Sequence, residues 1–327
     1  MILSILLSGL ALAPVAARVD DGHPAWSHDG RYLAFDRTRQ LDVEYSNTSV
    51  YVVRSDGRRL RYITPTSVPI DAARPVWSPH GGWIAFEVGS KYLPTGVQWE
   101  RRDGRRANAP SAGGDSSNTA SSPSWSPDGR KLAFGGRFGS GFGLYVAERD
   151  TGQARRVAAG EARFTAWSPA GRRIAYSGST SVALVSPEGG PVTRLAAPPA
   201  RISWAPDGTR IAYATGCAVG TVAADSIGPP PTRTPCPPEI ETSTPSWSPD
   251  GKRIAYSVCR RPVCSMFVTP ATPNGVGGVQ IPRGRDPAWS PDGRTIAYTR
   301  VVSAQPTRIY LIRPDGTHAR PLLRGGR

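Results

Sequence analysis

The segment Pro245-Ser246-Trp247-Ser248-Pro249-Asp250-Gly251-Lys252-Arg253-Ile254-Ala255-Tyr256 is the clearest copy of a motif that occurs seven times in this chain of 327 residues. Every copy has a Trp, with Gly four positions later, Leu or Ile seven later, Ala eight later, and Phe or Tyr nine later. The seven Trp residues are Trp26, Trp77, Trp125, Trp167, Trp204, Trp247 and Trp289. Their mean spacing of about 44 residues is typical of a propeller in which each repeat forms one four-stranded blade.

Each repeat divides into four predicted strands. Strand A carries the Trp, Ser-Pro-Asp-Gly forms a turn, the Ile-Ala-Tyr segment forms strand B, and strands C and D follow. The positions of Ser, Pro and Gly suit a type I turn in which Gly adopts a positive φ. The Asp can accept a hydrogen bond from its own backbone in such a turn, so we interpret it as structural rather than catalytic. The first repeat predicts strands at Pro24–Ser27, Tyr32–Asp36, Ser49–Arg54 and Arg61–Thr64, with an insertion at Arg37–Thr48.

The predicted fold class is all-β: a seven-bladed β-propeller of four-stranded antiparallel blades, with six-bladed closure as the alternative. One domain, residues 18–327, would contain blades that begin near residues 22, 73, 121, 163, 200, 243 and 285. The repeats begin with a strand A and end with a strand D. We therefore expect blade 1 to pack on blade 7 without a strand borrowed from the other terminus, although a short strand at Arg18–Asp21 could add to an edge.

Residues 1–17 resemble a signal peptide. The apolar run Ile2–Ala13 is too short to span a bilayer as a helix, and Val15-Ala16-Ala17 supplies the small residues of a cleavage site. The alternative is a cytosolic chain with an apolar beginning. No other stretch approaches membrane length, so the sequence predicts an exported protein, periplasmic or secreted, with no transmembrane segment after cleavage.

Four cysteines lie in repeats five and six. An even number of Cys in an exported chain indicates disulfides, and four Cys allow three connectivities. Because Cys259 would end one strand and Cys264 begin its neighbour, we predict the pairs Cys259–Cys264 and Cys217–Cys236, while the crossed pairings stay open. Their expected role is to stabilise the weakly patterned fifth blade. A metal site is disfavoured because no His lies near these cysteines.

The formal net charge is +15, mostly from Arg. A cationic surface attracts anionic partners such as acidic polymers, lipid head groups or acidic proteins. The alternative is that the composition reflects genome base bias, with the charges spread over solvated faces. Export disfavours nucleic acid as the partner.

The variable loops are predicted to share one face of the ring. The A–B and C–D turns would lie on the other face, because successive strands alternate in direction. Binding residues usually lie on variable loops held by a rigid frame. Four arginines shortly before a Trp would approach the central channel from the loop face and could bind carboxylates or sulfates: Arg74, Arg163, Arg201 and Arg285. The alternative is that these arginines pair with Asp71, Glu161 and Asp286 beside them.

The histidines do not form an obvious site. His28 and His80 are predicted on the turn face and His23 before strand A, so we expect them not to converge. The sequence therefore predicts no metal ion, no cofactor and no catalytic residue.

The motif P-x-W-S-P-D-G-x-x-I-A-[YF] resembles the TolB-type propeller repeat over residues 22–323. The resemblance implies a propeller fold and an exported, non-enzymatic protein that binds other proteins of the cell envelope. The best-known member of the family has an extra N-terminal domain and six blades, whereas this chain has seven repeats and is expected to have no such domain.

The same repeat builds the propellers of prolyl-oligopeptidase-type peptidases and of some pectate-fragment lyases. A peptidase of this type needs a G-x-S-x-G motif, which the chain lacks, and the lyases need a cluster of His. The first hypothesis is therefore an exported, non-catalytic scaffold that binds a protein or a polyanion. The alternatives are a saccharide lyase or hydrolase that uses carboxylates such as Asp42 and Glu44, and a secreted structural domain docked to another subunit. The partner and the oligomeric state do not follow from the sequence.

Overall fold

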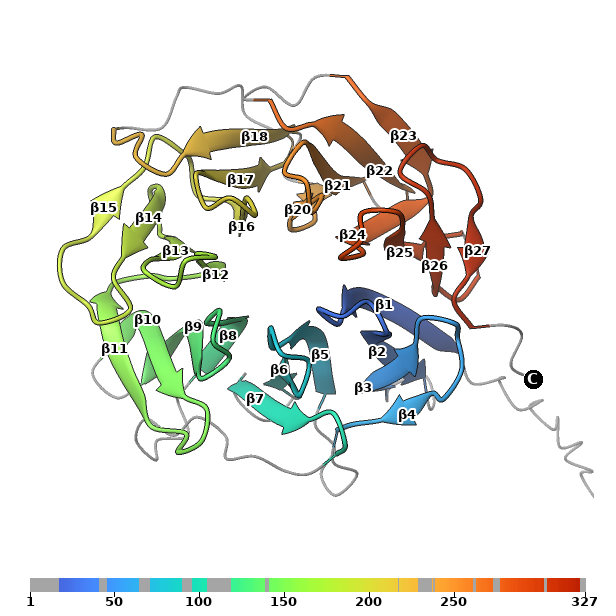
Figure 1. Cartoon of the computed structure of the whole chain (residues 1–327), viewed down its shortest axis with the longest axis horizontal. Coiled ribbons are helices and arrows are strands. Elements are labelled where there is room, and N and C mark those ends of the chain that lie inside the picture. Colours follow the sequence, from blue (N-terminus) through green and yellow to red (C-terminus); the bar gives the residue numbers. More distant parts are fainter. Residues whose placement is uncertain are drawn as a thin grey trace, which may run out of the picture.

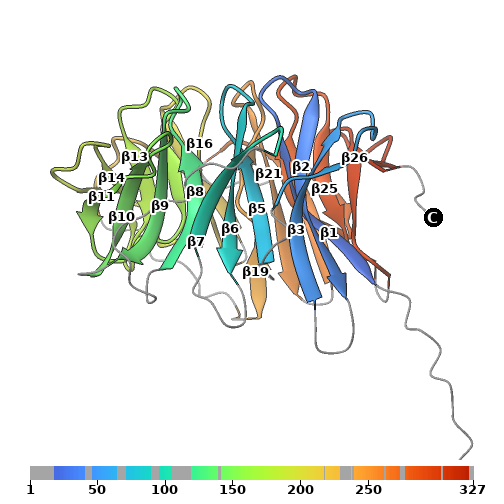
Figure 2. The same ribbon diagram turned by 90° about the horizontal axis from the view of Figure 1, so that it is seen from below.

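A computed structural model describes residues 18–40, 46–64, 71–89, 96–104, 119–138, 141–216, 218–228, 237, 239–260, 263–272, 277–302 and 305–323. Throughout these residues the regular structure is β-strand. Seven antiparallel sheets are arranged as the blades of a ring, in chain order around a central channel (Figure 1). The strands run from one face of the ring to the other (Figure 2). The prediction of a seven-bladed β-propeller is confirmed.

The strands follow the repeats of the sequence. Blade 1 contains β1 (Val19–Trp26), β2 (Tyr32–Gln40), β3 (Ser46–Arg54) and β4 (Arg61–Tyr62). Blade 2 contains β5 (Asp71–Trp77), β6 (Trp83–Gly89) and β7 (Gly96–Arg101). Blade 3 contains β8 (Thr119–Trp125), β9 (Lys131–Phe138), β10 (Gly141–Glu148) and β11 (Ala154–Ala159). Blade 4 contains β12 (Thr165–Trp167), β13 (Ile174–Ser177), β14 (Val182–Val185) and β15 (Thr193–Arg194).

The remaining blades are less regular. Blade 5 contains β16 (Arg201–Trp204), β17 (Arg210–Thr215) and β18 (Ala218–Ala223). Blade 6 contains β19 (Ile240–Thr242), β20 (Ser246–Trp247), β21 (Arg253–Arg260), β22 (Val263–Pro270) and β23 (Val279–Pro282); both β19 and β20 pair with β21. Blade 7 contains β24 (Gly284–Trp289), β25 (Ile296–Arg300), β26 (Arg308–Ile312) and β27 (Arg320–Pro321). The described parts of blades 2 and 5 comprise three strands each.

The Ser-Pro-Asp-Gly turn forms as predicted. In blade 6 the Ser248 hydroxyl donates to Asp250 Oδ1 over 2.6 Å, and the Lys252 backbone N–H donates to the same oxygen over 3.1 Å. Gly251 has φ of 67°, a conformation that only Gly adopts without strain. These contacts hold the pKa of Asp250 below its usual value, first through the hydrogen bond from Ser248. The motif Asp therefore stabilises the turn, as the sequence predicted.

The repeated Trp connects neighbouring blades. The indole N–H of Trp77 donates to Ala25 O in blade 1 over 3.0 Å, and that of Trp204 donates to Ala166 O in blade 4 over 2.9 Å. The same bond to the preceding blade is made by Trp26, Trp125 and Trp247. The other two indoles depart from the pattern: Trp167 donates within its own turn, to Gly171 O, and the buried Nε1 of Trp289 has no hydrogen-bond partner among the described residues.

The ring closes by contact between blades 1 and 7. Each of these sheets takes its strands from one end of the chain, so no strand crosses the seam in the described residues. The Trp26 indole donates to Ala288 O over 3.1 Å, and the Asp21 N–H donates to Thr307 O over 3.0 Å. The Thr307 hydroxyl in turn donates to Asp21 O over 2.9 Å. The two blades lie side by side in Figure 1. This arrangement agrees with the predicted closure without a borrowed strand.

Several predicted boundaries were wrong. Strand A of blade 1 begins at Val19, so the segment Arg18–Asp21 contributes to β1 itself instead of forming a separate edge strand. The predicted insertion Arg37–Thr48 mostly continues the hairpin, because β2 extends to Gln40 and β3 begins at Ser46. In this hairpin Arg37 is paired with Ser49 and Thr38 with Thr48. Residues 37–40 are all polar, so this extension of β2 lacks the apolar alternation by which a strand is predicted from sequence.

The predicted signal peptide, residues 1–17, lies outside the described residues. Within the part of the chain that the structure describes, no helix is long and apolar enough to cross a membrane.

Candidate functional site at the channel mouth

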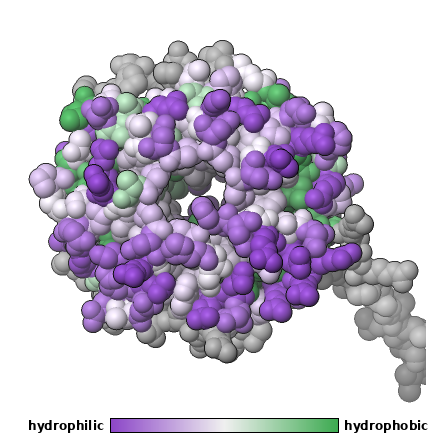
Figure 3. All heavy atoms as spheres, in the orientation of Figure 1, coloured by the Kyte–Doolittle hydropathy of each residue, from purple (hydrophilic) through white to green (hydrophobic). Residues whose placement is uncertain are grey.

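A channel enclosing about 1160 Å³ runs through the centre of the ring, and Figure 3 shows its opening. The end formed by the A–B turns is lined by His28, His80 and the turn prolines Pro79, Pro127, Pro169, Pro206, Pro249 and Pro291. The opposite end lies at the beginnings of the inner strands. It is lined by charged and hydroxyl side chains: His23, Arg74, Arg201, Glu241, Thr242, Ser243, Thr244, Arg285 and Asp286. We call this second end the charged mouth.

Bulges in the inner strands shape the charged mouth. The register shifts in β1, β5, β8 and β24, each time around the third residue before the Trp. That residue has positive φ in all four: His23 (44°), Arg74 (54°), Ser122 (55°) and Asp286 (52°). A bulge redirects side chains and leaves one residue outside the ladder. The bulges therefore place residues of several types at the same point of the channel wall.

Proline explains where the bulges occur. The residue two before the Trp is Pro24, Pro75, Pro123 and Pro287 in the four bulged strands, and Pro245 in blade 6, where the inner strand is split into β19 and β20. Proline has no N–H to give to the ladder, so a regular inner strand cannot continue through it. Blades 4 and 5 have Thr165 and Ile202 at this position, and their inner strands are regular. This signal was present in the sequence and was missed.

An acceptor from the preceding blade holds each left-handed residue of blades 2, 3 and 7. The Arg74 N–H donates to Asp36 Oδ2 over 2.9 Å, and the Ser122 N–H donates to Glu87 Oε1 over 2.8 Å. The Asp286 N–H reaches Ser257 Oγ at 3.4 Å. Each acceptor is the tenth residue after its Trp, directly beyond the repeated aromatic of strand B. The polar residue at this position therefore connects one blade to the next.

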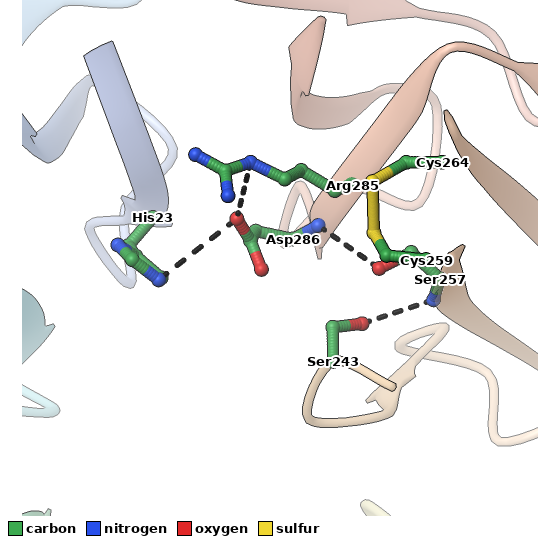
Figure 4. The surroundings of a disulfide bond; sticks show 7 residues. All are labelled: His23, Ser243, Ser257, Cys259, Cys264, Arg285 and Asp286. Carbon is green, nitrogen blue, oxygen red and sulfur yellow. Dashed lines mark hydrogen bonds and ion pairs between the residues drawn. A yellow bond between two sulfur atoms is a disulfide. The ribbon is translucent and has the colours of Figure 1, made fainter. Parts of the chain in front are cut away.

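His23 lies between two carboxylates at the ring seam. Its Nδ1 is 2.8 Å from Asp36 Oδ2 in blade 1. Its Nε2 is 3.9 Å from Asp286 Oδ2 in blade 7, and Figure 4 shows this second contact. Burial alone would lower the pKa of His23, but the charges of Asp36 and Asp286 outweigh it and raise the pKa above the usual value. Burial would likewise raise the pKa of Asp36, but His23 and the Arg74 N–H bring it below the usual value. The pair is therefore most stable as an imidazolium and a carboxylate.

The prediction that His23 precedes strand A was wrong, because the residue lies inside β1. His28 and His80 line the opposite end of the same channel. Among the described residues no group of three or more His, Cys, Asp or Glu is arranged to hold a metal ion.

Three of the four predicted arginines line the channel: Arg74, Arg201 and Arg285. Arg163 does not; its side chain is 65% exposed and pairs with Glu161 at 2.6 Å. Arg285 contacts Asp286 at 3.4 Å, which agrees with the alternative prediction that these arginines pair with neighbouring acidic residues. Arg74 approaches Glu87 at 3.4 Å rather than Asp71, which instead accepts the Thr48 N–H.

Arg201 has a different environment. Its guanidinium lies over the Phe164 ring, 4.6 Å from the centroid, and no carboxylate of the described residues is within ion-pair distance. Burial, and next the charge of Arg74, lowers the pKa of Arg201. Asp286, Glu87 and Glu241 act in the opposite direction. Arg201 is thus a half-buried cation in the channel wall, and Arg74 is the charged residue that acts on it most strongly.

A disulfide lies beside the charged mouth. Cys259 and Cys264 are directly opposite in the β21–β22 hairpin and are bonded, with their Cα atoms 4.0 Å apart (Figure 4). The predicted pair Cys259–Cys264 is confirmed. Cys217 and Cys236 fall outside the described residues, so their predicted bond stays a prediction.

Removing the disulfide by the double change Cys259→Ser/Cys264→Ser is expected to lower the free energy of unfolding by about 2 kcal/mol, because the bond closes only a short loop in the unfolded chain. Urea unfolding of the wild type and the variant at one pH measures the difference. Dithiothreitol should lower the midpoint of the wild type more than that of the variant. Equal stability of the two proteins without reductant would contradict the prediction.

Comparison with known proteins addresses the fold. A TolB structure from Agrobacterium tumefaciens aligns with 88% of this chain and 100% of its own, at 16% identity and a TM-score of 0.54. The fold is that of a TolB-like β-propeller. Oligogalacturonate lyase from Vibrio parahaemolyticus aligns over 91% of both chains, at 12% identity and a TM-score of 0.60. The propeller domain of the Trilobed protease from Pyrococcus furiosus, which has an open velcro topology, aligns over 94% of this chain and 98% of its own, at 11% identity and a TM-score of 0.62.

At sequence identities of 11–16%, the likeness to these structures shows the fold alone. No protein-family model matches this TolB-like propeller, and no curated protein matches its sequence. Both binding proteins and enzymes use the architecture, so the activity has to be argued from the channel and its side chains.

Proposed function

We propose that the protein is an exported, non-catalytic scaffold that binds another protein, of the cell envelope or outside the cell, at the charged mouth. The observation that carries the proposal is the grouping of side chains that differ between the repeats, including Arg74, Arg201 and Glu241, at one end of the channel. The other end repeats the same turn and its proline. A rigid frame with varied polar groups at one site is the usual design of a binding surface.

Export is supported by two independent features. Residues 1–17 have the pattern of a signal peptide, and Cys259–Cys264 is a disulfide of the kind that persists in oxidising compartments. The TolB-like fold also suits a protein that binds other proteins.

The acid–base properties of the charged mouth favour binding over catalysis. A general acid at neutral pH needs a carboxyl group with a raised pKa. Asp36, which meets His23 here, has a lowered pKa, and its Oδ2 already accepts the Arg74 N–H. The carboxylates of the enzymatic alternative, Asp42 and Glu44, lie outside the described residues.

Photo-crosslinking tests the proposal. A crosslinking residue at Thr244, an exposed position of the charged mouth, is compared with one at Gln153, exposed in the β10–β11 turn of the opposite face. Each full-length protein is mixed with the envelope and secreted fractions of its source cells. Discrete protein adducts from position 244 but not from 153 are expected.

Two outcomes would overturn the proposal. The first is equal adduct formation from both positions, or none from position 244. The second is turnover of an acidic oligosaccharide by the purified protein that is lost in Asp42→Asn or Glu44→Gln. Binding abolished by moderate salt at every site would point to a polyanion that contacts the cationic surface in general.

A further inference from the structure

We propose that Arg74 and Arg201 form a clamp across the charged mouth that binds a carboxylate of the bound protein segment. The inference rests on the proposed function and names the chemistry of its site. Arg74 comes from blade 2 and Arg201 from blade 5, so they belong to opposite parts of the ring, and both line the channel.

Arg201 has no counter-ion among the described residues. A cation taken out of water needs a compensating anion or hydrogen-bond acceptors. Arg201 is packed on Phe164, and the described residues offer it no carboxylate at ion-pair distance. Its environment therefore disfavours the charge it carries, and an incoming anion would relieve this cost. A half-buried guanidinium without a counter-ion is suited to binding an anionic ligand.

The other three arginines differ in how firmly each is paired with an acidic residue. Arg163 and Arg285 have acidic neighbours, at 2.6 Å and 3.4 Å, adjacent or nearly adjacent in sequence. Arg74 contacts Glu87 at 3.4 Å, the same distance as between Arg285 and Asp286, but the side chain of Arg74 is 43% exposed, against 33% for Arg285, whose Nε is buried. An exposed ion pair of this length contributes little, so Arg74 can turn toward a ligand at small cost. Two of the four arginines are thus available to an anion.

The acidic residues around the clamp select the kind of anion. Glu87, Glu241 and Asp286 all act on the charge of Arg201. They would repel a dianionic phosphate about twice as strongly as a singly charged carboxylate. Each guanidinium fork matches the two oxygens of a carboxylate. The clamp is therefore suited to a group with one negative charge.

The channel favours a peptide carboxylate over that of a sugar acid. Sugar rings bind well where an aromatic face is free to stack against them. Among the tryptophans that line the channel, Trp125, Trp167 and Trp289 are packed between blades with 7–8% of their surface exposed. Trp26 and Trp77 are half-buried and are held by indole hydrogen bonds to the preceding blade, and the face of Phe164 is covered by Arg201. Hydroxyl groups of Thr242, Thr244 and Ser246 line the same channel and can bond to peptide groups.

The test uses a defined probe, N-acetyl-glutamate N-methylamide, with its uncharged glutamine analogue as the control. Binding to the full chain is followed by NMR of the arginine side-chain Nε–Hε signals. We expect saturable binding of the glutamate probe and none of the glutamine analogue. A charge-assisted hydrogen bond contributes enough that Arg201→Gln and Arg74→Gln should each weaken binding at least about tenfold.

Arg163→Gln is the matched control, because Arg163 is on the same face but lies outside the clamp and is paired with Glu161. It should leave probe binding unchanged. Arg201→Lys, which keeps the charge but loses the fork, should bind with intermediate affinity. If Arg201→Gln does not fold, Arg74→Gln and Arg201→Lys still test the clamp.

The proposal is overturned if Arg163→Gln weakens the probe as much as Arg201→Gln does, or if no saturable binding occurs. It is also overturned if inorganic phosphate or galacturonate binds more tightly than the glutamate probe. The test distinguishes failure of the clamp from failure of the proposed scaffold function. If the probe binds but no protein adduct forms from position 244, the clamp is supported and the scaffold function is refuted. If adducts form and Arg201→Gln does not change them, the scaffold function is supported and the clamp is refuted.

Discussion

Replacing Trp204 by alanine is expected to lower the free energy of unfolding by about 3–5 kcal/mol, the usual cost of removing a large aromatic side chain from a core. Trp204 is 8% exposed and shares a core cluster with Ala175 and Leu184 of blade 4 and with Ile202 of its own strand. Its indole N–H donates to Ala166 O, and the Arg173 guanidinium lies over its ring at 5.7 Å. The change therefore removes packing, a hydrogen bond and a cation–π contact at one blade interface.

Phenylalanine substitutions separate the hydrogen bond from the packing. Trp204→Phe leaves the Ala166 carbonyl without its donor, whereas Trp289→Phe removes an Nε1 that has no partner among the described residues. The two Trp residues are buried to nearly the same degree, and an Arg guanidinium lies over each ring. We expect Trp204→Phe to destabilise more than Trp289→Phe by about 1 kcal/mol. Guanidinium unfolding of the three variants measures this, and an equal loss in both Phe variants would refute a role for the indole bond.

Asp36→Asn is expected to lower the free energy of unfolding by about 3 kcal/mol. Breaking a buried ion pair from one side costs about 3–5 kcal/mol, and the lower value applies because the His23 side chain is 34% exposed. His23 Nδ1 and the Arg74 N–H both meet the same oxygen, Asp36 Oδ2. An amide oxygen in its place carries no negative charge, so it cannot offset the charge of the imidazolium. The loss affects the contact of blade 1 with blade 2 and the seam with blade 7.

The loss of unfolding free energy in Asp36→Asn should depend on pH, and the pKa shifts of His23 and Asp36 define the direction. The pKa of His23 is raised, so its contribution is complete below the unfolded value of roughly 6.5 and is lost as the pH rises through the folded value. The pKa of Asp36 is lowered, so its contribution is present above roughly 3.9 and is lost as the pH falls through the folded value. The difference between wild type and Asp36→Asn should therefore be largest between about pH 4 and 6.5 and should decrease in alkali.

Unfolding in urea at pH 5, 7 and 9 measures this dependence. Glu87→Gln is the matched control, because Glu87 occupies the corresponding position of blade 2 and accepts the Ser122 N–H without contacting a histidine. Its effect should stay constant between pH 5 and 9. A pH-independent effect of Asp36→Asn would show that the imidazolium does not contribute to the seam.

Local sequence chemistry was sufficient to predict the frame of the propeller. The turn around Asp250 and Gly251 depends on residues within four positions of one another, and its conformation follows from their own backbone preferences. The period of the Trp residues gave the number of blades for the same reason, since one repeat builds one blade. The Cys259–Cys264 bond was predictable because a hairpin places its two strand ends opposite each other.

The long hairpin of blade 1 and the inner-strand bulges were not predicted. Arg37 and Thr38 are polar, so the extension of β2 lacked the apolar alternation on which strand prediction depends. Pro75 and Pro287 did mark the bulges, because a residue without an N–H interrupts the ladder. That signal could have been used, and with it the left-handed residues at the mouth could have been located.

The sequence by itself determined that seven similar blades form and where each turn lies, because these depend on interactions inside one repeat. The repeat pattern also predicted that Arg74, Arg201 and Arg285 approach the channel, but only the tertiary structure decided which side chains contact one another there. His23 and Asp286 are brought together by ring closure, and Arg74 and Arg201 by the curvature of the whole ring. Such contacts depend on the angle between blades, a property of packing that no single repeat encodes.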